Sequence, residues 1–201
     1  MPMQTRLFLL HKPYGYISQF VSNEKTRKNK KKLGELYNFP KGTMAIGRLD
    51  ESSEGLLLLT TDGQLSVEVR SRKVEKEYFA LVDGIITPSA ISALQSGVEI
   101  SIKQKTYTTM PCQARAMKTS EVYWAHSRDV RDERHGPTSW LSITLTEGKN
   151  RQVRKMTAAV GFPTLRLIRV RIGDVHLNQL PAGEVVELDG IDIGICPNPK
   201  P

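Results

Sequence analysis

Four consecutive leucines, Leu56 to Leu59, restrict the fold more than any other feature of the chain. Gly55 precedes the run, and Asp62 and Gly63 follow shortly after it. Continuous apolar runs of this length are typical of a strand covered on both faces, whereas an edge strand alternates apolar and polar residues. The run therefore predicts a central strand of a sheet. Asp62 is then expected to cap a short helix that extends through Arg70.

Short strand and helix patterns lie on both sides of this strand along the chain. We expect strands at residues 6–10, 78–82, 98–102, 113–117, 122–125, 140–146, 165–172 and 184–188, and helices at residues 88–95 and 151–160, the second with Asn150 as its N-cap. This mixed order predicts the α+β fold class. The length favours one domain or two closely packed lobes over residues 1–190, with a mobile basic loop insertion at about residues 23–32 and a disordered tail at residues 191–201.

The charge of the chain favours a polyanionic partner. The net charge is +8, and residues 24–32 alone contribute +5 of it. The basic residues of this segment are Lys25, Arg27, Lys28, Lys30, Lys31 and Lys32. Lysine and arginine that neutralise phosphates release condensed counterions, which drives binding to nucleic acids. Charge alone does not distinguish RNA from DNA or from a membrane surface.

The cysteines and the N-terminal segment indicate the cellular compartment of the protein. Cys112 and Cys196 are the only cysteines and lie far apart, so neither a disulfide framework nor a zinc site is predicted. The apolar stretch at residues 7–10 is too short for a signal peptide or a membrane span. We therefore expect a cytoplasmic protein with no metal and no membrane partner.

The predicted helix at residues 151–160 has a basic and an apolar face. At 100° per residue, Arg151, Arg154 and Lys155 share one side. The opposite side carries Val153, Met156 and Val160, which are expected to face the core. Residues 149–171 contain seven Lys or Arg and no Asp or Glu, which suits phosphate or carboxylate partners. The alternative is an ordinary solvated face.

Two shorter patterns are by themselves only weak evidence of a functional site. Gly47, Arg48, Leu49 and Asp50 precede the leucine run, and an Arg–Asp pair in a turn is usually a structural ion pair. Tyr78 begins a predicted strand, where a tyrosine is ordinarily a core residue with its hydroxyl at the rim.

In order along the chain, these patterns resemble the motifs of a known family. The matching segments are His11-Lys12-Pro13-Tyr14-Gly15, residues 47–63, Lys76-Glu77-Tyr78 and residues 147–156. Together they resemble the RsuA/RluB/RluE/RluF pseudouridine synthases over about residues 7–188. The second and fourth segments are long and specific, so a chance match to one motif does not explain the resemblance.

The resemblance implies a fold, an activity and a set of site residues. The implied fold is a mixed, mainly antiparallel sheet in two joined lobes with a central active-site cleft. Asp50 matches the catalytic aspartate, Tyr78 the tyrosine that stacks on the target uracil, and Arg154 the basic residue paired with the aspartate. Arg48 matches the arginine before the aspartate. We expect RNA to be bound by Arg48, Arg151, Lys155, Lys30, Lys31 and Lys32, and no cofactor to be needed.

Departures from the wider family suggest a subgroup. Ser53, Glu54 and Arg151 replace more usual residues and are similar to the RluE subgroup, which lacks the N-terminal S4 RNA-binding module. Only six residues precede the start of the resemblance at about residue 7, so we expect no S4 domain. The subgroup implies a uridine in 23S large-subunit ribosomal RNA as substrate and a monomeric enzyme. The basic loop is then expected to replace the S4 module in anchoring RNA.

Other functions remain open at this stage. A catalytically silent ribosomal RNA-binding factor would use the same basic surfaces, but it would not need Asp50, Tyr78 and Arg154. A hydrolase of the glycosidic bond would need a second carboxylate, for which Glu51 and Glu54 are the nearest candidates. In an isomerase, Asp50 could stabilise the developing sugar cation, trap it covalently or remove a ribose proton.

Overall fold

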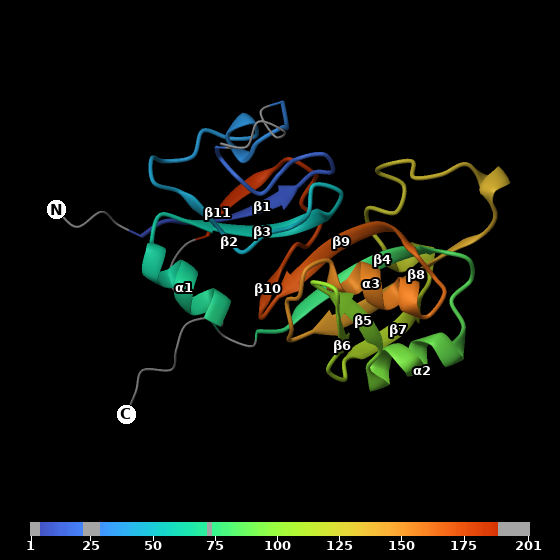
Figure 1. Ribbon diagram of the computed structural model, residues 1–201. Helices are drawn as coiled ribbons and strands as arrows, with labels where there is room; N and C mark the ends of the chain where they lie inside the picture. Colours follow the sequence, from blue (N-terminus) through green and yellow to red (C-terminus); the bar gives the residue numbers. More distant parts are fainter. Residues whose placement is uncertain (1–4, 22–28, 72–73, 189–201) are drawn as a thin grey trace. The chain divides into compact units, whose positions relative to one another are not determined.

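The computed structural model describes residues 5–21, 29–71 and 74–188. The chain forms two compact units (Figure 1). The first comprises residues 1–74 and 169–201, and the second comprises residues 75–168. The expected disordered tail at residues 191–201 lies outside the described residues. Among the residues that are described, no helix is long and apolar enough to cross a membrane.

The sheet of the first unit is built around the leucine run. Strand β3 (Glu54–Thr60) is buried along its whole length, which confirms the predicted central strand. β1 (Leu7–Lys12) pairs with it in antiparallel register, with Leu10 opposite Leu57. β2 (Met44–Ile46) also pairs with β3, and β11 (Val185–Leu188) pairs with the other side of β1. Helix α1 (Gly63–Ser71) packs on β2 and β3. As expected, its first turn is capped by Asp62, whose carboxylate accepts hydrogen bonds from the Gln64 and Leu65 amides.

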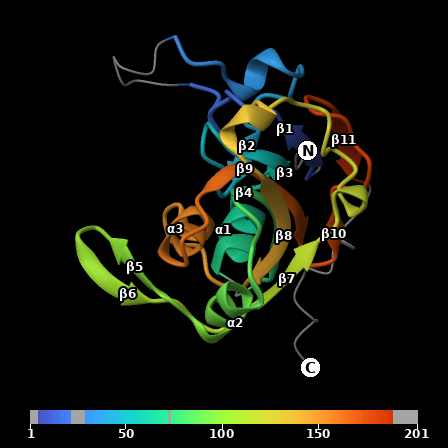
Figure 2. The ribbon, with the colours of Figure 1, turned by 90° about the vertical axis from the view of Figure 1, so that its right-hand side faces the viewer.

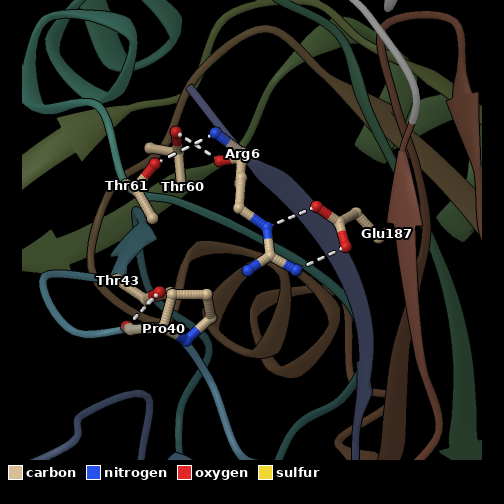
Figure 3. A network of polar contacts seen from close by, with 6 residues as sticks. All are labelled: Arg6, Pro40, Thr43, Thr60, Thr61 and Glu187. Atoms are coloured by element: carbon tan, nitrogen blue, oxygen red, sulfur yellow. Dashed lines mark hydrogen bonds and ion pairs between the residues drawn. The ribbon is translucent and has the colours of Figure 1, made fainter. Parts of the chain in front are cut away.

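Polar contacts fix the start of β1 to both neighbouring strands (Figure 3). The Arg6 guanidinium forms a bidentate ion pair with the Glu187 carboxylate, with Nε–Oε1 and Nη2–Oε2 distances of 2.6 and 2.7 Å. On the other side, the Arg6 amide donates to the Thr61 hydroxyl, and the Thr60 hydroxyl donates to the Arg6 carbonyl. A register shift of β1 would break both sets of contacts, so they help to specify the pairing.

The second unit is built around a long antiparallel strand pair. β4 (Lys76–Asp83) and β8 (Thr138–Leu145) are paired over their whole length. β7 (Gln113–Met117) follows on β8, and β9 (Thr164–Ile172) lies next to β4. Residues 164–168 of β9 belong to this unit and residues 169–172 to the first. Helix α2 (Pro88–Ser96) packs on β7. The mixed, mainly antiparallel sheets with few helices confirm the predicted α+β class.

A hairpin in the second unit was predicted only in part. β5 (Glu99–Ile102) matches an expected strand, but β6 (Lys105–Thr108) was missed because its side chains are mostly polar. Lys103 and Gln104 join the strands with φ values of 50° and 64°. Figure 2 shows the hairpin reaching away from the sheet of its unit, and β5 contacts α3 (Gln152–Ala159).

The strand predicted at residues 122–125 is wrong. This segment follows a 3₁₀ turn (Thr119–Glu121) and is itself a turn. Val122 and Trp124 are buried while Tyr123 is 60% exposed, and this alternation imitates a strand. The Trp124 carbonyl instead accepts a 2.7 Å hydrogen bond from the buried Arg166 guanidinium. A charged side chain thus satisfies a backbone group that a strand partner would have satisfied. β2 and the two-residue β10 (Val175–His176) were not predicted because they are short.

Candidate active site

Asp50 lies half-buried in the loop that joins β2 to β3. Its carbonyl accepts a hydrogen bond from the Ser53 amide at 3.0 Å. The next carbonyl, of Glu51, accepts from the Gly15 amide at 2.8 Å. The Ser18 hydroxyl donates to the Leu49 carbonyl at 2.8 Å and accepts from the Leu49 amide at 3.0 Å. These bonds from residues 15–18 hold the backbone on both sides of Asp50.

Two glycines allow this loop and strand to form, for different reasons. Gly47 has a φ of 74°, and no atom lies within 4 Å of the position that a Cβ would occupy. It is therefore needed for its backbone conformation and not for a close approach to another group. The close approach occurs at Gly55, where a Cβ would lie 2.3 Å from the Arg169 carbonyl oxygen. Any side chain there would push β3 away from that segment of β9.

Sequence reasoning missed Lys12, which lies fully buried at the end of β1. Its ammonium donates to the carbonyls of Pro13 at 2.8 Å and Tyr16 at 2.6 Å. Burial lowers the pKa of Lys12 to about 8, although attraction to Glu54, Asp50 and Glu51 opposes this shift. Lys12 is therefore a cation close enough to the Asp50 loop to interact with its carboxylates. The signal in the sequence was a lysine in the first matching motif, two residues after the apolar stretch at residues 7–10.

The lysines of the basic segment are anchored to the same unit. Lys30 forms an ion pair with Glu51, and the Lys31 ammonium lies 5.4 Å from the centroid of the Tyr16 ring. The Lys31 carbonyl also accepts from the Ile17 amide, and the Lys32 ammonium donates to the Lys30 carbonyl. Residues 29–32 thus contact several groups of the first unit, whereas their mobility stays a prediction. The remaining basic residues expected there, Lys25, Arg27 and Lys28, lie outside the described residues.

Tyr78 lies in β4 of the second unit, as expected. It is opposite Ile143 in the pairing with β8 and is only partly buried, packed against the hydrophobic core of that unit. A partly exposed aromatic ring can stack on a nucleobase.

Helix α3 begins differently from the prediction. Arg151 is the N-cap residue, with φ 51° and ψ 34° in the left-handed region, so the prediction of Asn150 as N-cap is wrong. The Gln152 Oε1 accepts a 3.0 Å hydrogen bond from the Lys149 amide, which lies ahead of the helix and not in its first turn. The Gln152 Nε2 donates to the Glu147 carboxylate at 2.7 Å. The same carboxylate also accepts hydrogen bonds from the Tyr107 hydroxyl and the Met110 amide. Glu147 thereby ties the hairpin to the start of α3.

The predicted faces of α3 are found in part. Val153 and Met156 are buried in the core, whereas Val160, just past the helix end, is only partly buried. On the basic side Arg151 is exposed, but Arg154 and Lys155 are partly buried. The Arg154 guanidinium donates to the Thr164 carbonyl at 3.2 Å, which fixes one of its nitrogens on β9.

The predicted site residues are thus distributed over both units. Arg48, Asp50 and Lys30, Lys31 and Lys32 belong to the first unit, and Tyr78, Arg151, Arg154 and Lys155 to the second. The pairing of Arg154 with Asp50 stays a prediction. Within the described parts of the chain, no cluster of three or more His, Cys, Asp or Glu could hold a metal ion.

Comparison with known proteins supplies the class of this fold and these motifs. A solved structure described as a pseudouridylate synthase superimposes on 92% of the chain and 70% of its own length, with a TM-score of 0.72 and 25% identity. The fold is therefore that of a pseudouridine synthase. A family model described as RNA pseudouridylate synthase matches residues 6–159.

Curated relatives extend over most of the chain. A protein of Xanthomonas axonopodis pv. citri (strain 306) is 42% identical over 87% of this chain and 89% of its own length. A protein of Vibrio vulnificus (strain CMCP6) is 38% identical over 92% of this chain and 76% of its own length. Both are named ribosomal large subunit pseudouridine synthase E. This chain belongs to the RNA pseudouridylate synthase family, which confirms the resemblance drawn from its motifs.

Proposed function

We propose that this enzyme converts a uridine of 23S large-subunit ribosomal RNA to pseudouridine. The observation that carries the proposal is the similarity to relatives that are named for the ribosomal large subunit and that match 87–92% of the chain. The basic net charge of +8 supports a polyanionic substrate.

Asp50 is proposed as the catalytic carboxylate. The reaction breaks the bond from ribose C1′ to uracil N1, turns the base and joins C1′ to C5. C5 then loses its proton and N1 gains one, so no cofactor, oxidant or external group donor is consumed. Breaking the first bond places positive character on the sugar, which a nearby carboxylate can stabilise, trap covalently or relieve by removing a ribose proton. The hydrogen bonds that hold the loop at Leu49, Asp50 and Glu51 would keep this carboxylate oriented.

The other predicted residues are proposed to bind and position RNA. Tyr78 would stack on the target base after it leaves its helix, which recovers about 1–3 kcal/mol of the unstacking cost. Arg154 would oppose the charge of the catalytic carboxylate, a role for which a permanently charged guanidinium is suited. Arg48, Arg151 and Lys155, together with Lys30, Lys31 and Lys32, would contact phosphates.

The test is a pseudouridine map of ribosomal RNA from cells that lack the gene. We expect one large-subunit position to lose its pseudouridine, and the wild type but not Asp50→Asn to restore it. Asp174→Asn is the matched control, because Asp174 is an exposed aspartate of the same unit outside the proposed site. If every pseudouridine persists in the deletion strain, the proposal of a 23S substrate fails.

The alternative of a glycosidic hydrolase is less well supported. Its candidate second acids are Glu51, which is paired with Lys30, and Glu54, which is 3% exposed in β3. A general acid has to reach the leaving base, and neither environment favours that. Release of free uracil from the RNA by the purified protein would establish hydrolysis.

We also propose that the enzyme acts as a cytoplasmic monomer with a catalytic domain over residues 1–190. Light scattering on the purified protein should give the mass of one chain, 22.6 kDa. A mass twice as large at micromolar concentration would contradict the monomer.

A further inference from the structure

The first unit contains an open hollow of about 560 Å³ beside the Asp50 loop. Three segments line it: residues 18–21, the stretch from Thr43 to Arg48, and Arg70 in α1. Sites for small molecules or single nucleotides have volumes in this range.

Two arginines give the hollow a positive lining. Arg48 comes from the loop after β2, and Arg70 from the last turn of α1, so two separate elements each contribute an arginine to the lining of the hollow. No Asp or Glu is among the lining residues. Of the side chains that the structure describes, no carboxylate pairs with either arginine, and Arg70 bonds only to the Ser66 carbonyl, through its Nε. The remaining donors of both guanidiniums are suited to a phosphate.

An aromatic ring and an amide complete the lining. Phe20 is partly buried, and its ring is held edge-on against Phe39 with centroids 5.4 Å apart. A ring fixed in this way can stack on a base without first being ordered. Gln19, which also lines the hollow, has an amide that can both donate to and accept from a base edge.

We propose that this hollow binds a second nucleotide of the RNA substrate, close to the target uridine. Arg48 and Arg70 hold its phosphate, Phe20 contacts its base, and Gln19 contacts the base edge. The inference rests on the proposed function, because it takes the polyanion to be the RNA on which Asp50 acts.

The position of the hollow explains why the nucleotide is a near neighbour of the target. Arg48 and Asp50 are two residues apart, so their Cα atoms lie within about 7 Å of each other. Ser18 lines the hollow and also makes both hydrogen bonds to Leu49 between them. Occupation of the hollow therefore bears directly on the backbone that carries Asp50.

The first experiment maps the RNA that reaches the hollow. Val21 lines it and is 73% exposed, so a photoreactive phenylalanine analogue can replace Val21 without disturbing the core. After irradiation with a protein-free 23S transcript, we expect crosslinks at one or two nucleotides within about five positions of the modified uridine. The same analogue at exposed Tyr123 of the second unit controls for unspecific contact. Crosslinks scattered over the transcript, as from Tyr123, would overturn the proposal.

The second experiment tests the arginine that the family motifs do not include. Arg70→Gln should raise KM for the transcript about tenfold, the effect of one lost charge-assisted hydrogen bond, and change kcat less. It should also lower the slope of log binding constant against log salt concentration by about 0.7. Lys41→Gln removes an exposed charge from the same unit without altering the lining, and it should leave KM and kcat unchanged. Thermal unfolding of both variants verifies that they fold.

The outcomes separate this inference from the proposed function. If the wild type forms pseudouridine but Arg70→Gln behaves as Lys41→Gln, the hollow does not bind the substrate, whereas the proposed function stands. If Val21 crosslinks to one RNA site but no pseudouridine forms anywhere, the proposed function fails, whereas the hollow is an RNA site. An acidic peptide that competes with RNA for the Val21 crosslink at equal charge would show a protein ligand instead and would overturn the assignment.

Discussion

The Lys12 ammonium is charged although it lies in a strand in which every residue is buried. It is close enough to the loop that carries Asp50 to interact with its carboxylates. Removing such a charge from water is costly, and the two carbonyls of Pro13 and Tyr16 together with nearby carboxylates offset part of that cost. At neutral pH its pKa of about 8 leaves the amine mostly charged. Lys12 therefore contributes a fixed positive charge to the first unit close to the candidate catalytic carboxylate.

The lowered pKa of Lys12 predicts how stability depends on pH. Its value is about 8 in the folded protein against 10.5 for a free lysine, so between these pH values the unfolded chain binds more protons. The free energy of unfolding then rises with pH in that window. Relative to Lys12→Met, which has no such group, the wild type should gain roughly 2 kcal/mol between pH 7.5 and 9.5. Urea unfolding of both proteins at the two pH values measures this gain.

The comparison with Lys12→Met removes the contribution of groups that the substitution does not affect. A difference between the two proteins that stays constant from pH 7.5 to 9.5 would mean that Lys12 keeps an ordinary pKa and is reached by water.

At this scale the sequence motifs suggested residues for the chemistry but not those that support them. Asp50 was proposed as the catalytic carboxylate because it lies in a long motif of consecutive residues. Lys12 and Gly55 matter through contacts with residues distant in the chain, Gly55 with the backbone of Arg169 and Lys12 with the carboxylates around Asp50. Such contacts depend on strand pairing, which local patterns do not specify.

Among the elements, α3 begins at a strained residue. Arg151 occupies the left-handed region, which costs an L-residue other than Gly, Asn or Asp about 1–2 kcal/mol. Arg151→Asn should therefore raise the free energy of unfolding by up to ~1 kcal/mol. It should also weaken RNA binding several-fold if Arg151 contacts phosphate as proposed. Urea unfolding and filter binding of a 23S transcript measure the two effects.

Arg151→Lys is the matched control for this pair of effects, because it keeps the charge and the strain. It should leave stability unchanged and reduce RNA binding less than Arg151→Asn does. If Arg151→Asn destabilises the protein, the left-handed conformation is not a source of strain there.

The carboxylate of Glu147 holds the start of α3 to the hairpin. Burial acts to raise its pKa, but hydrogen bonds from Tyr107, the Met110 amide and Gln152 outweigh this, so the pKa of Glu147 lies below its usual range. The ionised Glu147 carboxylate therefore stabilises the folded protein above the pKa of about 4.5 that it has in the unfolded chain. This stabilisation is lost as the pH falls through the lower pKa of Glu147 in the folded protein. Glu147→Gln should thus destabilise the protein by about 1–2 kcal/mol at pH 7 and by much less at pH 3.

Chemical unfolding at the two pH values provides the measurement for Glu147. Glu99→Gln is its control, since Glu99 is an exposed glutamate of the same hairpin, and it should change stability little at either pH. An equal loss at pH 7 and pH 3 would show that the carboxylate charge does not support the network.

The elements that were predicted well are those with an unambiguous apolar pattern. β3 and β8 have long buried runs, and α2 has Pro88 at its start with Thr87 as its cap. The errors arose where a pattern had two explanations, as in the alternating burial of Val122 and Trp124, or where it was absent, as in the polar β6. The start of α3 was misplaced because the left-handed conformation of Arg151 directly before the helix is not apparent from the sequence pattern.

At the scale of the whole molecule, the charge of +8 predicts RNA binding that weakens with salt. The lysines at residues 30–32 differ in how much of that charge they can offer. Lys30 is paired with Glu51, so this pair adds no net charge to the surface, whereas the Lys31 ammonium lies over the Tyr16 ring. Phosphate contacts should therefore depend more on Lys31 and Lys32 than on Lys30.

This difference predicts the salt dependence of two variants. Each phosphate contact contributes about 0.7–0.9 to the slope of log binding constant against log salt concentration. Replacing both Lys31 and Lys32 by Gln should reduce the slope by about 1.5, whereas Lys30→Gln, which also releases Glu51, should change it by less than about 0.3. Titrations of a protein-free 23S transcript between 50 and 300 mM KCl give the slopes, and thermal unfolding shows whether each variant folds. Equal slopes for both variants and the wild type would mean that residues 30–32 make no phosphate contact, and the anchoring of RNA would then have to come from other basic residues, such as Arg48 and Arg70 of the first unit or Arg151 and Lys155 of the second.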